Sequence, residues 1–383
     1  MKKIYLINIA ILTFFLILLV LFLGLLNKIL SGVPIYDRLK IDRNQLTYIK
    51  SKDLEFKNKF IPKINELKIN ENIIVKCGYQ ESGIYHLVME QDIYGFRDNK
   101  IEAYNNSDIV MIGDSFSYSV CVNQPYDLKS QLEILSKKKV LNLSQSGSGP
   151  ILQLNTIKKY ANNAKFDYFI WIFYEGNDLE ELIDEIKILK ENPNLYEKDQ
   201  LFDSIGAKQI LQSKNDIFVD YNKLIKLQQK FPEKKIIDYK WQNEKFVKIK
   251  IFLAEQLRGL NSLIKFFINY KQKIPNKEYD NVVKEMNIYL SNKKIKEKYI
   301  YYLPKYTRLA NKYKKHPEVE SLNQIKNLVE YTANKYGFRF IDGANFFHSR
   351  EVPLDVFPHK VPTHFNENGY KLLAEHINTF ISK

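Results

Sequence analysis

The chain has 383 residues, of which 45% are hydrophobic and 14% aromatic, and its 58 Lys and Arg against 44 Asp and Glu give a formal net charge of +14. This composition excludes a chain that is disordered overall, and the two cysteines exclude a disulfide-stapled scaffold and an ordinary Cys-based zinc site. The length allows one large domain with insertions or two domains of ordinary size.

The first predicted element is an apolar helix at residues 4–26, a run without charge that follows Lys2 and Lys3. At about 1.5 Å per residue this helix spans a hydrocarbon core of ~30 Å, which predicts a transmembrane anchor. The two lysines place the N-terminus in the cytoplasm and the rest of the chain outside it, in the periplasm or the extracellular space. The alternative is a cleaved signal peptide, but the run is longer than a usual signal and no small-residue cleavage site follows it.

Residues 27–105 are predicted to form a juxtamembrane spacer and an N-terminal hairpin region. The spacer is rich in Lys and Asn, and residues 73–89 contain two apolar runs around a Gly-containing turn. Two such runs around a turn are typical of a β-hairpin.

Three short apolar runs follow, at residues 108–115, 140–149 and 166–178, and each ends in small or polar residues. Segments of helix length, at 126–138 and 151–162, separate them. Strands that alternate with helices at this spacing predict a parallel sheet with crossover helices.

The composition changes at residues 181–319, which are rich in Lys, Glu, Leu and Ile and almost free of Gly, with apolar residues at helical spacing. We expect a helical insertion there. The α/β pattern returns with a predicted helix over 318–336, a strand over 338–345 and a terminal helix over 367–381.

The α/β core is therefore assigned to residues 106–180 and 320–383, and its functional residues are expected at the carboxyl ends of the strands. Ser115, Gly147 and Asn177 follow the first, second and third predicted strands. Each also fits a structural role, as a helix N-cap, a turn glycine and a capping asparagine.

A nucleophilic serine needs a base, and a neutral histidine is the usual one at pH 7. His364 lies directly before the terminal helix, and His359 is a second candidate because it is close in sequence. The other histidines lack this setting: His86, His316, His348 and His376.

Taken in this order, the motifs GDSF at 113–116, NLSQSG ending in Gly147, GND at 176–178, and His364 followed by FNENGY resemble the SGNH (GDSL-type) hydrolases. The strings around the first three are similar to a membrane-anchored bacterial branch, like proteins of cell-envelope polysaccharide loci. The resemblance covers about residues 73–180 and 320–383.

The resemblance implies a flavodoxin-like three-layer α/β/α fold, with Ser115 as nucleophile and His364 as base. It implies an oxyanion hole made by the backbone N–H groups of Ser115 and Gly147 and by the side chain of Asn177. We expect no cofactor and no metal.

One departure from the family concerns the third member of the triad. The family usually has Asp three or two residues before the His, and here Val361 and Pro362 stand at those positions. Asp355 is the candidate replacement, and a backbone carbonyl near Val361 is the alternative. Losing this group need not abolish the chemistry of the Ser–His pair.

The two cysteines, Cys77 and Cys121, could form a disulfide if the domain is periplasmic, and the alternative is two buried free thiols.

Basic and aromatic residues interleave at 234–252 and 293–316, a composition that can bind single-stranded nucleic acid. Because the domain is expected to lie outside the cytoplasm, its expected partner is an anionic glycan or a lipid headgroup rather than nucleic acid. The alternative is that these segments are amphipathic helices whose lysines are only solvated and bind no partner.

These features predict a membrane-anchored serine esterase or O-acyltransferase of SGNH type that acts on an acyl ester, such as an acetylated glycan of the cell envelope. The alternative is a non-catalytic envelope protein that binds glycan on the same scaffold. A nucleotide-binding Rossmann-like protein is disfavoured because no GxGxxG or GxxxxGK[ST] motif follows a strand.

Overall fold

The computed structural model describes most of residues 92–191 and 274–382, four strands outside these ranges, and parts of 13–22. Single residues and short stretches inside the two long ranges are not described, namely 93, 95, 98–99, 121, 123, 313–317 and 361.

The centre of the structure is a parallel five-stranded sheet in the order β5-β4-β6-β8-β9. Its strands are β4 (Ile109–Gly113), β5 (Val140–Asn142), β6 (Tyr168–Tyr174), β8 (Glu297–Leu303) and β9 (Arg339–Asp342). Numbered along the chain, this order is 2-1-3-4-5, the flavodoxin-like order, and it reverses direction between β4 and β6. The predicted parallel α/β core is confirmed.

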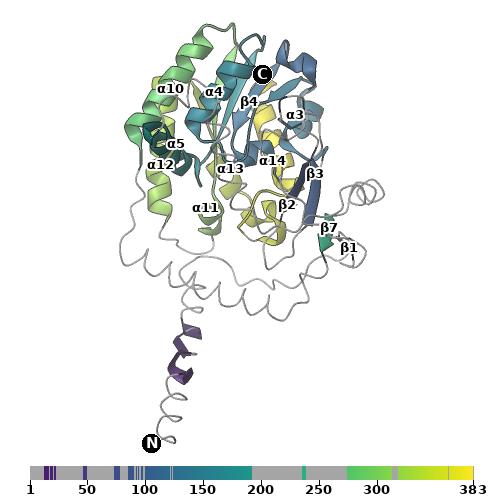
Figure 1. The fold of residues 1–383 in the computed structure, drawn as a ribbon, viewed down its shortest axis with the longest axis vertical. Coiled ribbons are helices and arrows are strands. Elements are labelled where there is room, and N and C mark those ends of the chain that lie inside the picture. The colour runs from purple at the N-terminus through teal and green to yellow at the C-terminus, as the bar shows by residue number, and fades with distance from the viewer. Residues whose placement is uncertain are drawn as a thin grey trace, which may run out of the picture.

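Helices cover both faces of this sheet, which makes three layers (Figure 1). One face packs against α4 (Pro150–Tyr160), α5 (Asp178–Glu191), α10 (Asn276–Ser291) and α12 (Val319–Lys335). The other packs against α3 (Leu128–Ser136), α11 (Tyr306–Ala310), α13 (Gly343–His348) and α14 (Glu367–Ile381). Short elements complete the core: η4 (Ile101–Tyr104), α2 (Ser115–Tyr118), η6 (Pro353–Val356) and η7 (Pro358–Lys360).

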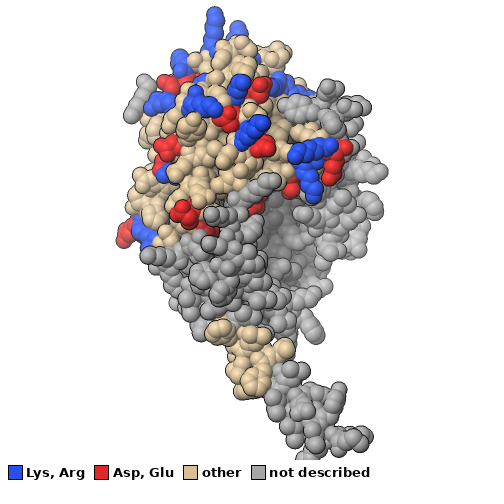
Figure 2. Space-filling model, turned by 90° about the vertical axis from the view of Figure 1, so that its left-hand side faces the viewer, with Lys and Arg blue, Asp and Glu red and all other residues tan. Residues whose placement is uncertain are grey.

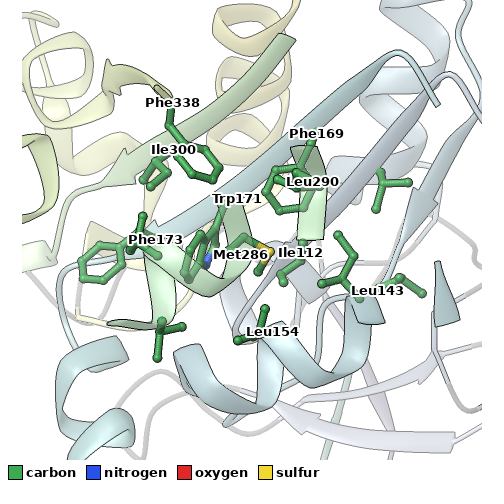
Figure 3. Packing of buried hydrophobic residues seen from close by; sticks show 14 of the residues in the cluster. Ile112, Leu143, Leu154, Phe169, Trp171, Phe173, Met286, Leu290, Ile300 and Phe338 are labelled. Carbon is green, nitrogen blue, oxygen red and sulfur yellow. The ribbon is translucent and has the colours of Figure 1, made fainter. Parts of the chain in front are cut away.

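Strand β6 shows why its sequence, YFIWIFY, forms a central strand. Alternate side chains of a strand point to opposite faces, and Phe169, Trp171 and Phe173 enter one helical layer while Ile170 and Ile172 enter the other. All five are fully buried. Figure 3 shows Trp171 at the middle of the first layer, among side chains of the sheet and helix α10. This burial fixes the end of β6, where a candidate residue follows.

A second, four-stranded sheet has the order β1-β7-β3-β2. Its strands are β1 (Leu46–Ile49), β2 (Ile73–Cys77), β3 (Tyr85–Met89) and β7 (Lys235–Asp238). The antiparallel pairing of β2 with β3 confirms the predicted hairpin. Strands β1 and β7 were not expected from the sequence.

The range 181–319 is not the purely helical insertion that the sequence predicts. It contains β7, and its C-terminal part contains α10 and β8, which belong to the three-layer core. Strand β8 lies between β6 and β9, so the sheet would be divided without it. The sequence reasoning missed β8 because its string, EKYIYYL, lies in a Lys- and Tyr-rich stretch that resembles an exposed helix.

Within the described residues, no helix is both long enough and apolar enough to cross a membrane. Most of the predicted anchor at 4–26 lies outside those residues, as does most of the spacer at 27–105.

On the molecular face in Figure 2, basic and acidic side chains are interspersed.

Candidate active site

Ser115 lies where the sheet order reverses, directly after β4 and at the first position of α2. Ligands of open α/β sheets bind at this point, outside the carboxyl ends of the strands. Asp114 is the N-cap of α2, and its Oδ1 accepts a hydrogen bond from the backbone N–H of Phe116 at 2.8 Å. This cap explains why the helix begins at the serine. Ser115 is 7% exposed, so its hydroxyl is held in a nearly buried position.

His364 reaches Ser115 from the other end of the chain. Its Nε2 lies 2.8 Å from the Ser115 Oγ, a hydrogen bond between residues 249 positions apart. Phe365, which is fully buried, and Asn366, which caps α14 through the N–H of Gly369 at 2.9 Å, anchor the loop directly before the helix. The structure thus brings together the two residues that the sequence offered as candidate nucleophile and base.

The imidazole of His364 packs against an aromatic ring. The centroids of the Phe116 and His364 rings are 4.8 Å apart, and Phe116 also stacks on Tyr174 at 4.0 Å. Burial lowers the pKa of His364 to about 4, because the charged imidazolium loses its hydration. The ring is therefore neutral at pH 7 and able to accept a proton.

Asp355 does not form the third member of a triad in this structure. Its carboxylate pairs with Lys360 Nζ at 2.7 Å, and its side chain is 45% exposed. Within the described part of the chain, His364 has Ser115 as its hydrogen-bond partner and none on Nδ1. Val361, whose carbonyl was the alternative partner, lies outside the described residues. The described site is thus a Ser–His pair rather than a complete triad.

Gly147 lies in the turn after β5 with a φ of 74°, a left-handed conformation that favours glycine. The turn is tied to the end of β4, since the Gln145 N–H and the Ser148 hydroxyl both donate to the Gly113 carbonyl, at 3.1 and 3.0 Å. Among the described residues, the backbone N–H groups of Ser115 and Gly147 donate to no acceptor. Both are free to bind an incoming oxygen atom.

The buried carboxyl group of Glu185 lies against the end of this turn, next to Gly149 and the start of α4. Glu185 in α5 accepts hydrogen bonds from the N–H groups of Ile151 and Leu152, at 2.9 and 3.1 Å, and so caps the start of α4. A Cβ on Gly149 would lie 2.7 Å from this carboxyl group, which explains the second glycine of the SGSG string. Burial raises the pKa of Glu185 to about 8.

Asn177 follows β6 and precedes α5, the third predicted position. Its Nδ2 donates to Glu181 Oε1 at 2.7 Å, and its side chain lies close enough to the carboxylate of Asp114 to lower the pKa of that group. Burial raises the pKa of Asp114 to about 6 and that of Asp178 well above its usual value. Three candidate positions, after β4, β5 and β6, therefore gather at one edge of the sheet, together with buried acidic groups.

Sequence reasoning missed an ion pair next to this edge. Arg308 in α11 contacts the carboxylate of Glu175, with Nε and Nη2 each 2.8 Å from an oxygen, and the Glu175 side chain is fully buried. The Lys305 N–H, at 2.8 Å, and the Tyr302 hydroxyl also donate to Glu175. Arg308 in turn donates to Asn323 in α12 at 2.8 Å. Glu175 stands two residues before Asn177, so the pair fixes the loop that holds it.

The remaining candidates are not brought into this site. Cys121 and the side chains of Cys77 and His359 lie outside what the structure describes, so the predicted disulfide and the second candidate base stay predictions. His376 instead hydrogen-bonds to the Tyr301 hydroxyl at 2.8 Å and stacks on Phe346. In the described part of the chain, no group of three His, Cys, Asp or Glu side chains is arranged to hold a metal ion.

No family model matches the chain. In an alignment of 186 positions that covers 44% of its length, the chain is 27% identical to DNA-directed RNA polymerase subunit beta' of Oedogonium cardiacum, but it spans only 9% of that protein. Among solved structures, the acetylxylan esterase Axe2 from Geobacillus stearothermophilus is 12% identical with a TM-score of 0.37, over 72% of this chain and 94% of the esterase.

Proposed function

We propose that this protein is a serine esterase or O-acyltransferase that uses Ser115 as nucleophile and His364 as base. The observation that carries the proposal is the 2.8 Å contact between Ser115 Oγ and a half-buried, neutral His364 at the switch point of the sheet. A serine next to a neutral base is the arrangement needed to attack an acyl carbonyl. The resemblance of the sequence motifs to SGNH hydrolases supports the same chemistry.

In the first half-reaction, Ser115 Oγ bonds to the acyl carbon while its proton passes to His364 Nε2. The carbonyl electrons move onto the oxygen, and the free N–H groups of Ser115 and Gly147, with the Asn177 amide, stabilise this oxyanion. The tetrahedral intermediate then expels the alcohol, which takes the proton from His364. The acyl group remains on Ser115 as an ester.

In the second half-reaction, His364 takes a proton from the incoming nucleophile, whose oxygen bonds to the acyl carbon. The bond between that carbon and Ser115 Oγ then breaks, and His364 returns the proton to Ser115 Oγ. Water as the nucleophile makes the protein an esterase, and a sugar hydroxyl makes it a transferase. Both share the first half-reaction, so the described site serves either. The proposed substrate is an acyl ester of a cell-envelope polysaccharide, and the proposed location is outside the cytoplasm, with residues 4–26 as a membrane anchor.

The experiment that tests the proposal is covalent labelling of the full-length protein, purified in detergent, with a fluorophosphonate probe. Labelling at Ser115, lost in Ser115→Ala and strongly slowed in His364→Gln, is the expected result. No labelling of the folded wild-type protein would overturn the proposal.

The second candidate function is a non-catalytic glycan-binding protein on this scaffold. The exposed Asp355–Lys360 pair favours it, because the carboxylate that orients the histidine in a full triad is engaged elsewhere. Labelling of Ser115 that depends on His364 would exclude it, since binding of a glycan needs no activated hydroxyl.

The pH profile separates a pair from a triad. We expect kcat/KM for p-nitrophenyl acetate to stay high down to about pH 5 and to fall near pH 4, because burial lowers the pKa of His364 to about 4 and only the neutral ring is a base. Asp355→Asn should leave both the rate, within about twofold, and this acid limb unchanged. An acid limb that shifts in Asp355→Asn would show that Asp355 does act on His364.

A further inference from the structure

We propose that Glu181 is a positioning residue that holds the carboxamide of Asn177 in the orientation required to donate to the acyl oxyanion. The inference rests on the proposed function and adds a residue to it. Glu181 lies in α5, one helical turn after Asn177, and it belongs to none of the four motifs that identified the site.

The contact between these two residues is made at two points. Asn177 Nδ2 donates to Glu181 Oε1 at 2.7 Å, and the backbone N–H of Glu181 donates to the Asn177 carbonyl at 2.8 Å. Residues four apart face each other along a helix, so the start of α5 brings the carboxyl group back over the asparagine. The NH2 end of the amide is thereby fixed.

The Asn177 side chain also lies beside the candidate nucleophile. It is close enough to the carboxylate of Asp114 to lower the pKa of that group, and Asp114 Oδ2 lies 3.3 Å from Ser115 Oγ. The other end of the amide, Asn177 Oδ1, is buried and has no hydrogen-bond partner in the described part of the chain. Orientation of the amide therefore depends on the contacts of Nδ2.

Orientation matters because the two ends of a carboxamide have opposite hydrogen-bonding character. If the amide turned by about 180° around its last bond, Oδ1 rather than Nδ2 would face the developing oxyanion. An acceptor there would repel the negative charge instead of stabilising it. Glu181 opposes this rotation, because its oxygen accepts only from the NH2 end.

Glu181 can hold the amide without placing a charge beside the oxyanion. Burial, with the nearby carboxylates of Asp114 and Glu185, raises the pKa of Glu181 to about 9, so the carboxyl group is neutral at pH 7. Its Oε2 is buried and without a hydrogen-bond partner among the described residues, and this oxygen is where the proton would sit. Because the glutamine side chain also carries a neutral oxygen acceptor, we expect Glu181→Gln to preserve the contact with Asn177.

The alternative is that Glu181 only stabilises the start of α5. A purely structural contact would change the melting temperature and the yield of folded protein, and it would not change kcat for the folded fraction. A positioning role changes kcat, leaves KM nearly constant and is rescued by a side chain that keeps the acceptor.

The test compares Glu181→Gln and Glu181→Met with wild type in the full-length protein, with Glu180→Met as the matched control on the neighbouring, exposed position. We expect Glu181→Met to lower kcat for p-nitrophenyl acetate by about 10- to 100-fold, with KM within about twofold, since one misaligned oxyanion donor costs about this much or more. Glu181→Gln should keep kcat within about threefold, and Glu180→Met should match wild type. In an Asn177→Ala background, Glu181→Met should have no further effect.

Two results would overturn the inference while leaving the proposed function intact. They are a wild-type kcat in Glu181→Met, and an equal loss in Glu181→Met and Glu181→Gln, each with hydrolysis still dependent on Ser115. Wild-type protein without Ser115-dependent labelling or hydrolysis would overturn the proposed function, and this inference with it. If Glu181→Met does not fold, Glu181→Asp takes its place, because the shorter side chain withdraws the acceptor from Asn177.

Discussion

Ser115→Ala is expected to lower kcat for p-nitrophenyl acetate by roughly 10³- to 10⁶-fold, the range found when a serine nucleophile is removed from a serine hydrolase. The hydroxyl is 2.8 Å from His364 Nε2 and 7% exposed, so neither a neighbouring side chain nor a bulk water can take its exact place. The serine-to-alanine change removes one oxygen atom and leaves the Asp114 cap of α2 in place, so folding should be preserved. The measurement is steady-state hydrolysis by full-length protein in detergent.

Ser291→Ala is the control for this experiment. Ser291 is exposed at the end of α10, and its hydroxyl bonds only within its own helix, to the Asn287 carbonyl at 2.8 Å and to the Asn287 side chain. We expect it to hydrolyse the ester at the wild-type rate. Equal rates for wild type and Ser115→Ala, with both proteins folded, would remove Ser115 from the mechanism.

Arg308→Met is expected to destabilise the fold by about 3 to 5 kcal/mol, the usual effect of breaking a buried ion pair on one side. The change leaves the fully buried carboxylate of Glu175 without its countercharge. Burial already raises the pKa of Glu175, and Arg308 opposes that shift. Urea unfolding followed by tryptophan fluorescence measures the loss, because Trp171 is buried in the same layered core.

The double variant Glu175→Met with Arg308→Met tests the cause. Removing both charges takes away the unpaired buried carboxylate, so the double variant should be more stable than Arg308→Met alone. Lys296→Met is the surface control, since the Lys296–Asp167 pair is solvent-exposed, and it should leave the urea midpoint nearly unchanged. A double variant less stable than Arg308→Met would mean that packing, rather than charge pairing, explains the effect.

The sequence was sufficient for those parts of the fold in which local pattern and tertiary structure agree. Apolar runs that end in GDS, SGSG and EGND predicted β4, β5 and β6, and chain order alone placed their following loops at one edge of the sheet. Ser115 and His364 were found because a nucleophile and a base of this kind need defined positions at strand and helix ends. The 2.8 Å contact itself needed the three-dimensional structure.

Strand β8 shows what the local pattern could not reveal. Its tyrosines look like surface residues in a basic stretch, yet Tyr299, Tyr301 and Tyr302 are buried. Each hydroxyl finds a distant acceptor or partner: the Phe380 carbonyl, His376 Nδ1 and Glu175. Partners in other elements decide whether a tyrosine can be buried, and sequence spacing does not contain them.

Asp355 was a candidate third member of the triad because it is close in sequence to His364, but in this structure its carboxylate pairs with Lys360. It lies nine residues before His364, near enough to reach it, but Lys360 lies closer along the same loop and pairs with it. The choice between two partners depends on how the loop bends through η6 and η7, which no motif specifies. The ion pair of Glu175 with Arg308 was missed because its partners are 133 positions apart.

The separation of 249 positions between Ser115 and His364 has a consequence for how the protein comes into being. Synthesis runs from the N-terminus, so Ser115 is made long before His364, and the contact between them can form only after nearly all of the chain exists. Only when α14 packs against the layer that holds α3 does His364 meet the serine. Loss of residues 364–383, by a premature stop or by a protease, would therefore leave Ser115 without its hydrogen-bond partner and remove the proposed base.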